Sequence, residues 1–437
     1  MKKLKILVVN GFSSGKMIVA EAKRMGYECF HLSTAMEGVP ESYMKHNMAT
    51  GYDGILERKE IFEDQVSLCR DYHFDIVMPG TESGVFLAEK LANALSLPCN
   101  DMNLTLARRD KYYMQKQLEE QGVPCIRSKL VRTAQEAIDW YRSNGMVKVV
   151  LKPRMDAGGI GFHLCETEAE IEKAFEGLYG QKSCFGEDLE SPDVLIQEYV
   201  TGEEIIVNHV SNNGVHELTD IWIYDKYGAI YSYAETINVL TAKYSDAVRY
   251  TQKALDALGI RVGPTHSEIM LTEKGPLLIE TGARPMGNML SCDTIKRIFG
   301  YSIIEKIIHS YVYPVHSNGV PGDGYRLSDL KCYIYCIRSY VEGRITGVPA
   351  EDILKNCSYV TDISLEILKD TMQVEKTIDL VTSPGTFGLV DEDEKALREW
   401  IELFRIVERE HPNMLFEFEN DAPLTEEEKD LMRRLRS

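Results

Sequence analysis

Apolar runs and helix-spaced apolar positions alternate along the N-terminal part of the chain. Three apolar runs have the length and composition of strands: Lys5–Val9, Glu28–Leu32 and Phe74–Met78. Helical spacing occurs between the runs, and the helical stretch Val85–Leu95 follows the last of them. Because strands joined by helices of this length form parallel sheets, residues 1–105 are predicted to fold as a Rossmann-like domain.

The pattern changes near residue 106. Helical spacing at Asp110–Gly122 and Ala134–Tyr141 leads into two apolar strands, Val147–Leu151 and Val194–Val200. Residues 205–245 then alternate in the way antiparallel strands do. The chain therefore changes from parallel α/β units to mixed α+β structure.

Beyond about residue 325 the chain is rich in strand patterns and in Gly and Pro turns, and a helix is expected over Glu392–Val407. Thr425 and Glu428 have the spacing of a capping box at the start of a last helix. We therefore expect a multidomain protein of the α/β and α+β classes, with boundaries at 1–105, 106–195, 196–325 and 326–437.

Composition restricts the binding partners and the cellular compartment that can be expected for this chain. The 437 residues exceed what one core usually supports, and the net charge of -19 disfavours binding to nucleic acid or to anionic membranes. No apolar run approaches the roughly 20 residues of a membrane span, and the first run is too short for a signal peptide, so a cytoplasmic protein is predicted. The ten cysteines are scattered without a CxxC pair, which excludes the usual zinc and disulfide patterns.

The first loop, Asn10–Lys16, looks superficially like a nucleotide-binding loop. Three residues separate Gly11 from Gly15, where a Walker A loop has four, and Met17 follows the lysine in place of Ser or Thr. A tight strand-to-helix turn is the better interpretation, and NAD binding is a weaker alternative.

Two later segments carry groups suited to a nucleotide. Lys152 ends an apolar strand and is followed by Gly158, Gly159 and Gly161, which could bring backbone N–H groups against phosphate. A hairpin with a flexible turn explains that loop equally well. The strand and linker Gln197–Glu204 could present its backbone to adenine and a carboxylate to ribose, although alone it is an ordinary strand and turn.

Residues 266–288 carry the strongest local signal. Two predicted strands flank the turn Thr272–Pro276, and pairing of Leu271 with Leu277 would place Glu268 and Glu280 at comparable depth. Two carboxylates so placed repel each other unless a cation lies between them, and hard oxygen ligands suit Mg²⁺ that bridges nucleotide phosphates. Arg284 could then neutralise a phosphoryl group in transfer. The alternative is a solvated hairpin with charged outer faces.

Taken in order, these segments and Lys111 resemble the ATP-grasp superfamily over residues 1–325. The resemblance implies that Lys111 and Lys152 contact ATP phosphates beneath a flap formed by the three glycines of the loop at 158–161. It also implies that the backbone of Glu198 and Val200 meets adenine and that Glu204 holds the ribose.

For catalysis, the resemblance implies that Glu268 and Glu280 hold Mg²⁺, or Mn²⁺ in its place, and that Arg284 and Lys152 act on the acyl phosphate and the transferring phosphoryl group. Many members have Asn where this chain has Gly282, so water or another group would complete the shell of the second metal ion. His266 is better explained as a packed or surface histidine than as a substrate contact.

Within the superfamily, Ile279–Asn288 is most similar to the L-amino-acid ligases. The function implied is ATP-dependent joining of a carboxylate to an amine, by way of an acyl phosphate, in an enzyme expected to be a homodimer. An ATP-dependent carboxylase using bicarbonate and an inactive nucleotide-binding regulatory subunit are the alternatives. The sequence does not name the two substrates.

Overall fold

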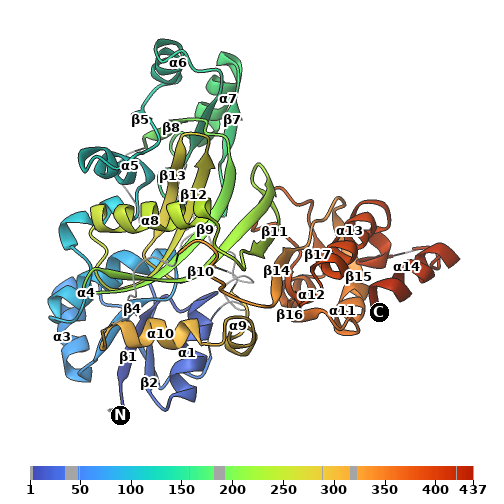
Figure 1. The fold of residues 1–437 in the computed structure, drawn as a ribbon, viewed down its shortest axis with the longest axis horizontal. Helices are drawn as coiled ribbons and strands as arrows, with labels where there is room; N and C mark the ends of the chain where they lie inside the picture. The colour runs from blue at the N-terminus through green and yellow to red at the C-terminus, as the bar shows by residue number, and fades with distance from the viewer. Residues whose placement is uncertain are drawn as a thin grey trace.

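The computed structural model describes residues 3–34, 48, 50–156, 158–181, 192–287, 289–314, 322–419 and 421–436. Asn288, which belongs to the ligase-like segment, lies outside these ranges. Three lobes surround a central sheet, with the N-terminus in the blue lobe and the C-terminus in the red one (Figure 1). None of the helices in the described ranges is long and apolar enough to span a bilayer.

The N-terminal lobe contains a four-stranded parallel sheet, as predicted. Its strand order is β3 (Gly54–Leu56), β2 (Glu28–Leu32), β1 (Lys5–Val9), β4 (Ile76–Pro79). Alternate residues of β1 face opposite sides, so that Ile6 packs in one core with Ile18 and Leu7 in another with Leu87. The helices of this lobe are α1 (Gly15–Arg24), α3 (Phe62–Tyr72) and α4 (Val85–Ala94).

A second four-stranded sheet forms the upper lobe in Figure 1. Its strand order is β5 (Ser128–Val131), β8 (Val194–Glu198), β6 (Val149–Lys152), β7 (His163–Cys165), all antiparallel. The apolar face of β6 and β8 packs against Ile171 and Phe175. The helices are α5 (Lys111–Glu120), α6 (Ala134–Ser143) and α7 (Glu168–Leu178). Lys152 therefore lies at the end of a buried strand, as predicted.

The central sheet has eight antiparallel strands. Its order is β13 (Gly275–Gly282), β12 (Gly263–Thr272), β9 (Glu203–Asn212), β10 (Val215–Tyr227), β11 (Ile230–Thr236), β14 (Lys331–Cys336), β18 (Thr386–Asp391), β16 (Val360–Ser364). Helix α8 (Ala242–Ala257) contacts β12 and β13, and α10 (Ile303–Ser310), which follows α9 (Cys292–Phe299), packs against α1. The sheet thus continues into the C-terminal lobe.

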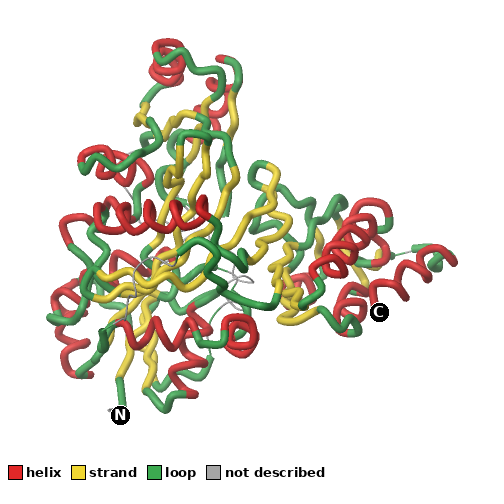
Figure 2. Tube along the Cα trace, in the orientation of Figure 1, coloured by secondary structure: helices red, strands yellow, loops and turns green. Residues whose placement is uncertain are grey.

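The C-terminal lobe combines the end of that sheet with a small three-stranded one. The small sheet has the order β17 (Gln373–Val374), β15 (Gly343–Gly347), β19 (Glu417–Phe418). Its helices, α11 (Pro349–Lys355), α12 (Glu366–Thr371), α13 (Glu394–Glu410) and α14 (Glu426–Arg436), lie mainly toward the outside of the lobe (Figure 2). The capping box is formed, since Glu428 N–H donates to Thr425 Oγ1 at 3.2 Å and Thr425 N–H to Glu428 Oε2 at 2.8 Å.

The domain boundaries remain a prediction. Strand β8 spans the expected boundary between residues 195 and 196. Strands on both sides of residue 325 belong to the same eight-stranded sheet. The chain therefore changes composition at these points without a break in its hydrogen-bonded structure.

The β12–β13 hairpin corrects one sequence-based detail. Leu271 pairs with Pro276 and not with Leu277, so the predicted register at the turn is wrong by one residue. A bulge between Glu268 and Ile269 compensates, and Glu268 still lies directly opposite Glu280. The pair of carboxylates is thus set by the bulge and not by the turn alone.

Candidate active site

Two adjoining cavities lie where the lobes meet. The first, called here the nucleotide cavity, is lined by most of the predicted nucleotide-site residues: Lys111, Lys152, Gly158, Gly159, Glu198, Val200, Glu204, Glu268 and Glu280. The second, called the substrate cavity, is lined by Arg284 and shares Gly158, Tyr224, Tyr231, Glu268 and Glu280 with the first. The structure therefore brings together segments more than 150 residues apart, with the two glutamates at the common wall.

The glycine loop closes one side of the nucleotide cavity. Gly158, Gly159 and Gly161 all have positive φ values, between 67° and 82°, which favour glycine. Gly161 does not line the cavity, and a Cβ there would lie 2.8 Å from the ring of Pro153. Gly161 therefore serves the packing of the loop against the end of β6.

Two lysines face the carboxylates across this cavity. Lys111 begins α5, which Asp110 caps by accepting from Tyr112 N–H at 2.9 Å, and its Nζ lies 2.7 Å from Glu280 Oε2. Lys152 is half-buried at the end of β6, and desolvation together with the nearby charge of Lys111 lowers the pKa of its ammonium group to about 8. An anion in this cavity would relieve both effects, as expected of a phosphate site.

A third carboxylate and a third lysine complete the cluster. Glu204 lies on β9, two residues from Ile206, which is opposite Glu268, and its Oε1 is 2.5 Å from Lys226 Nζ. Burial raises the pKa of Glu204 even though Lys226 opposes it. Burial also acts to raise the pKa of Glu268, but His266, Lys226 and Lys111 together lower it. Of Glu204 and Glu268, Glu268 is therefore the carboxylate that stays ionised.

The donor set fits a hard cation that also takes ligands from a nucleotide. Glu268 and Glu280 offer carboxylate oxygens from adjacent strands at one depth. Among the described residues no group of three or more His, Cys, Asp or Glu side chains is arranged to hold a metal alone. Two carboxylates and several phosphate oxygens are the surroundings in which Mg²⁺ is usually bound.

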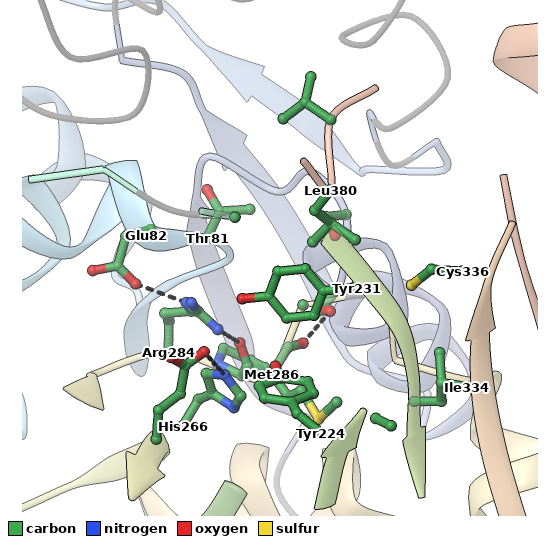
Figure 3. A pocket seen from close by; sticks show the side chains of 18 of the residues that line it. Thr81, Glu82, Tyr224, Tyr231, His266, Arg284, Met286, Ile334, Cys336 and Leu380 are labelled. Atoms are coloured by element: carbon green, nitrogen blue, oxygen red, sulfur yellow. Dashed lines mark hydrogen bonds and ion pairs between the residues drawn. The ribbon is translucent and has the colours of Figure 1, made fainter. Parts of the chain in front are cut away.

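Glu82 in the N-terminal lobe holds two arginines at the edge of the substrate cavity. Its carboxylate accepts from Arg284 Nε at 2.7 Å (Figure 3) and also from Arg109 Nη1. Burial alone would raise the pKa of Glu82, but the two guanidinium groups lower it to about 2. The position of Arg284 thus depends on a residue about 200 positions away in the chain.

This arrangement gives a physical reason for Gly282. A Cβ at residue 282 would lie 2.5 Å from Glu82 Oε2, closer than atoms approach without displacement. An asparagine there would displace the carboxylate that holds Arg284. The departure from the superfamily pattern therefore accompanies the Glu82 contact.

His266 belongs to a buried polar network behind Glu268. Its Nδ1 lies 3.0 Å from Asn208 Oδ1, and Asn208 Nδ2 donates to Asp220, which also accepts from Trp222 Nε1. Its Nε2 is 3.7 Å from Glu268 Oε1. His266 is thus packed as expected, and it also lines the substrate cavity.

Comparisons with known proteins support the resemblance found in the sequence. Residues 146–293 match the model of the ATP-grasp domain family. Dapdiamide A synthase of Enterobacter agglomerans is 30% identical over 422 residues, which cover 92% of this chain and 95% of that protein. The chain belongs to the ATP-grasp ligases.

More distant relatives of this ATP-grasp ligase include further ligases and solved structures with the same fold. Alanine–anticapsin ligase of Bacillus subtilis strain 168 is 25% identical over 321 residues, 68% of this chain and 66% of that one. The crystal structure of L-amino acid ligase from Bacillus licheniformis matches with a TM-score of 0.71 over 96% of this chain and 100% of that chain, at 18% identity. An N5-carboxyaminoimidazole synthase from Aspergillus clavatus has a TM-score of 0.68 at 15% identity, over 93% and 99% of the two chains.

The predicted family, fold class and enzyme class are therefore confirmed. The protein is an ATP-dependent ligase that joins a carboxylate to an amine through a carbon–nitrogen bond. Its fold is the mixed α/β and α+β multidomain architecture expected from the sequence.

Sequence reasoning missed Lys226, Glu82, Arg109 and the tyrosines of β10 and β11. From the sequence alone, Glu82 was given no role. A signal was present, because Glu82 follows the C-terminal end of a parallel strand, where ligand sites gather in α/β sheets. Lys226 had no comparable signal, since it lies in an ordinary alternating strand.

Proposed function

We propose that the ATP-grasp ligase joins two amino acids. The γ-phosphoryl group of ATP passes to the carboxylate of the first, giving an acyl phosphate and ADP. The amine of the second then displaces phosphate and forms the amide. The names of the relatives support this choice, since one is an alanine–anticapsin ligase and another an L-amino acid ligase.

One observation carries the proposal: the carboxylate pair forms the wall common to both cavities. Lys111 and Lys152 line only the nucleotide cavity, and Arg284 lines only the substrate cavity. A phosphoryl group that leaves one cavity for the other must pass Glu268 and Glu280. A phosphoryl donor in one cavity and an acceptor in the other would lie on opposite sides of that wall, as in-line transfer requires.

The nucleotide would be held by groups from both sheets. Lys111 and Lys152 bind its phosphates, and the glycine loop covers them and excludes water. The Glu198 N–H already donates to Arg127 O at 3.0 Å, so we expect its carbonyl, beside Val200, to meet the adenine amino group. Glu204 takes the ribose hydroxyls, for which its pairing with Lys226 must loosen.

Glu268 and Glu280 would hold Mg²⁺, or Mn²⁺ in its place, and the ion would neutralise charge on the transferring phosphoryl group. Arg284, fixed by Glu82, orients the acyl phosphate and stabilises the oxyanion formed when the amine attacks. These groups position and neutralise, and the chemistry needs no covalent enzyme intermediate. We also propose a homodimer, the commonest assembly for such enzymes, which sedimentation of the whole chain would test.

The test is an assay of products with pairs of amino acids. ADP, phosphate and one dipeptide should form in equal amounts, and AMP with pyrophosphate would contradict the proposal. A requirement for bicarbonate would favour a carboxylase instead. Arg284→Lys keeps the charge but loses the two-pronged guanidinium, so we expect kcat to fall roughly 100-fold or more while the KM for ATP changes little.

A further inference from the structure

The substrate cavity has two chemically different ends. Its charged lining residues, Glu82, Glu268, Glu280 and Arg284, gather where the N-terminal lobe meets the β12–β13 hairpin. Its other end is lined by Ala234 on β11, Ile334 and Cys336 on β14, and Leu380 with Val381 in the loop before β18. Figure 3 shows Ile334 and Cys336 across the cavity from Glu82 and Arg284.

The second end, called here the apolar end, carries no charged side chain among its described residues. Burial raises the pKa of the Cys336 thiol to about 12, so the thiol is neutral at any physiological pH. Tyr231 lies between the ends, and burial likewise raises its pKa, which keeps its hydroxyl protonated. A charged group placed there would lose its hydration without gaining a partner, whereas an aliphatic or aromatic group would gain contacts.

The loop that carries Leu380 is held by hydrogen bonds within the loop and to neighbouring segments. Thr377 N–H donates to Ser339 O at 3.0 Å, and Thr382 N–H donates to Asp379 Oδ1 at 2.9 Å. Leu380 N–H reaches Gly158 O at 3.4 Å, so this loop also touches the glycine loop over the phosphates. The apolar end is therefore a formed pocket wall and not a loose surface loop.

We propose that the apolar end receives the side chain of one of the two amino-acid substrates and selects for uncharged, apolar side chains. This inference rests on the proposed function. The reacting carboxylate must lie near Glu268, Glu280 and Arg284, and the side chains of both amino acids project from that centre. The apolar end is the part of the cavity that can take a side chain without burying an unpaired charge.

The experiment varies one amino acid at a time. In one arm hydroxylamine replaces the amine, and hydroxamate formation is measured with leucine, methionine, phenylalanine, glutamate and lysine. In the other arm the best carboxylate substrate is fixed and the same five amino acids serve as amines. In at least one arm we expect kcat/KM for the three apolar amino acids to exceed that for the two charged ones by about 100-fold.

Leu380→Lys tests the wall itself. Leu380 is only partly buried on a loop, so the substitution should leave folding intact, which its melting temperature will check. In the selective arm, kcat/KM for leucine should fall roughly tenfold or more and that for glutamate should rise. Leu164→Lys is the matched control, because Leu164 is 39% exposed on β7 and does not line the cavity; its preference should match the wild type.

The results separate the two levels of inference. No ADP release with any amino-acid pair would overturn the proposed function itself. Amide formation without a preference for apolar side chains in either arm would overturn only the selectivity. The same holds if Leu380→Lys and Leu164→Lys retain the wild-type preference equally.

Discussion

The two cavities achieve charge balance in different ways. In the nucleotide cavity two half-buried carboxylates each have a lysine as partner, Glu280 with Lys111 and Glu204 with Lys226. In the substrate cavity one carboxylate, Glu82, holds two arginines. Under the proposed function, a lysine partner would be exchanged for a metal ion or phosphate when the nucleotide enters, because an ammonium group is a flexible point charge. The arginine pair would instead act as a fixed support that stays in place when substrate binds.

The largest effect is expected from a substitution that breaks one of the carboxylate–lysine pairs of the nucleotide cavity. Glu280→Gln removes a charge from the proposed metal site and removes the carboxylate that pairs with Lys111 at 2.7 Å. Several kcal/mol of charge stabilisation is lost, so turnover should fall on the order of 1000-fold. Initial rates over a range of Mg²⁺ concentrations measure this, and added Mg²⁺ should restore little. Glu273→Gln, in the exposed turn of the same hairpin, is the control and should behave as wild type.

Glu82→Gln should break the ion pairs that hold Arg109 and Arg284. Removing one member of a buried ion pair typically costs about 3–5 kcal/mol of unfolding free energy. The pKa of Glu82 is about 2 in the folded chain, below its usual value of 4.5, so this stability is present above pH 4.5 and is lost as the pH falls toward 2. Urea unfolding of both proteins at pH 6, 4 and 3 should show the difference shrinking with acid. An undiminished gap at pH 3 would argue against the ion pair as its source.

A smaller effect concerns Lys152 and pH. Its pKa of about 8 lies below the usual 10.5, so the free enzyme loses this charge as the pH rises through 8. ATP phosphates favour the charged form, so ATP affinity should fall up to about tenfold per pH unit above 8. Calorimetry in buffers of different ionisation heat should show proton uptake on binding at pH 8.5. Lys152→Arg, which stays charged, should abolish that uptake.

The smallest effect is expected at Gly282. In Gly282→Ala the new methyl group meets Glu82 Oε2, and relieving such overpacking costs about 1–3 kcal/mol. Because the displaced carboxylate orients Arg284, kcat should fall by a larger factor than the KM for ATP rises. Steady-state kinetics give both values, and Gly177→Ala on α7, where no atom lies within 4 Å and which does not line either cavity, is the matched control. Equal behaviour of the two variants would show that Glu82 yields without cost.

The sequence could predict what is encoded locally. Lys152 and the glycines that follow it are adjacent in the chain, and the turn Thr272–Pro276 brings Glu268 and Glu280 together within one hairpin. Their cavity was therefore foreseeable even though the register at Leu271 was wrong. The first parallel sheet was predictable for the same reason, since its pattern repeats over short intervals.

The substrate cavity could not be predicted in this way. Its walls come from the first loop, the end of β4, β11, β14 and the loop at Leu380, and no local spacing links these segments. Glu82 and Arg284 meet only because the N-terminal lobe packs on the hairpin, which is a property of tertiary structure. The hydrophobic pattern of each of these segments predicts that the segment is buried. It does not predict which other segment it contacts.

The continuity of the eight-stranded sheet limits how such an enzyme can be rearranged. β11 is hydrogen-bonded to β14, which belongs to the C-terminal third of the chain. A protein cut after residue 325 would expose an unpaired β11 edge, a template for aggregation. Exchange of whole C-terminal segments between related ligases would therefore require a donor strand of matching register, whereas changes confined to the loop at Leu380 would leave every strand pair intact.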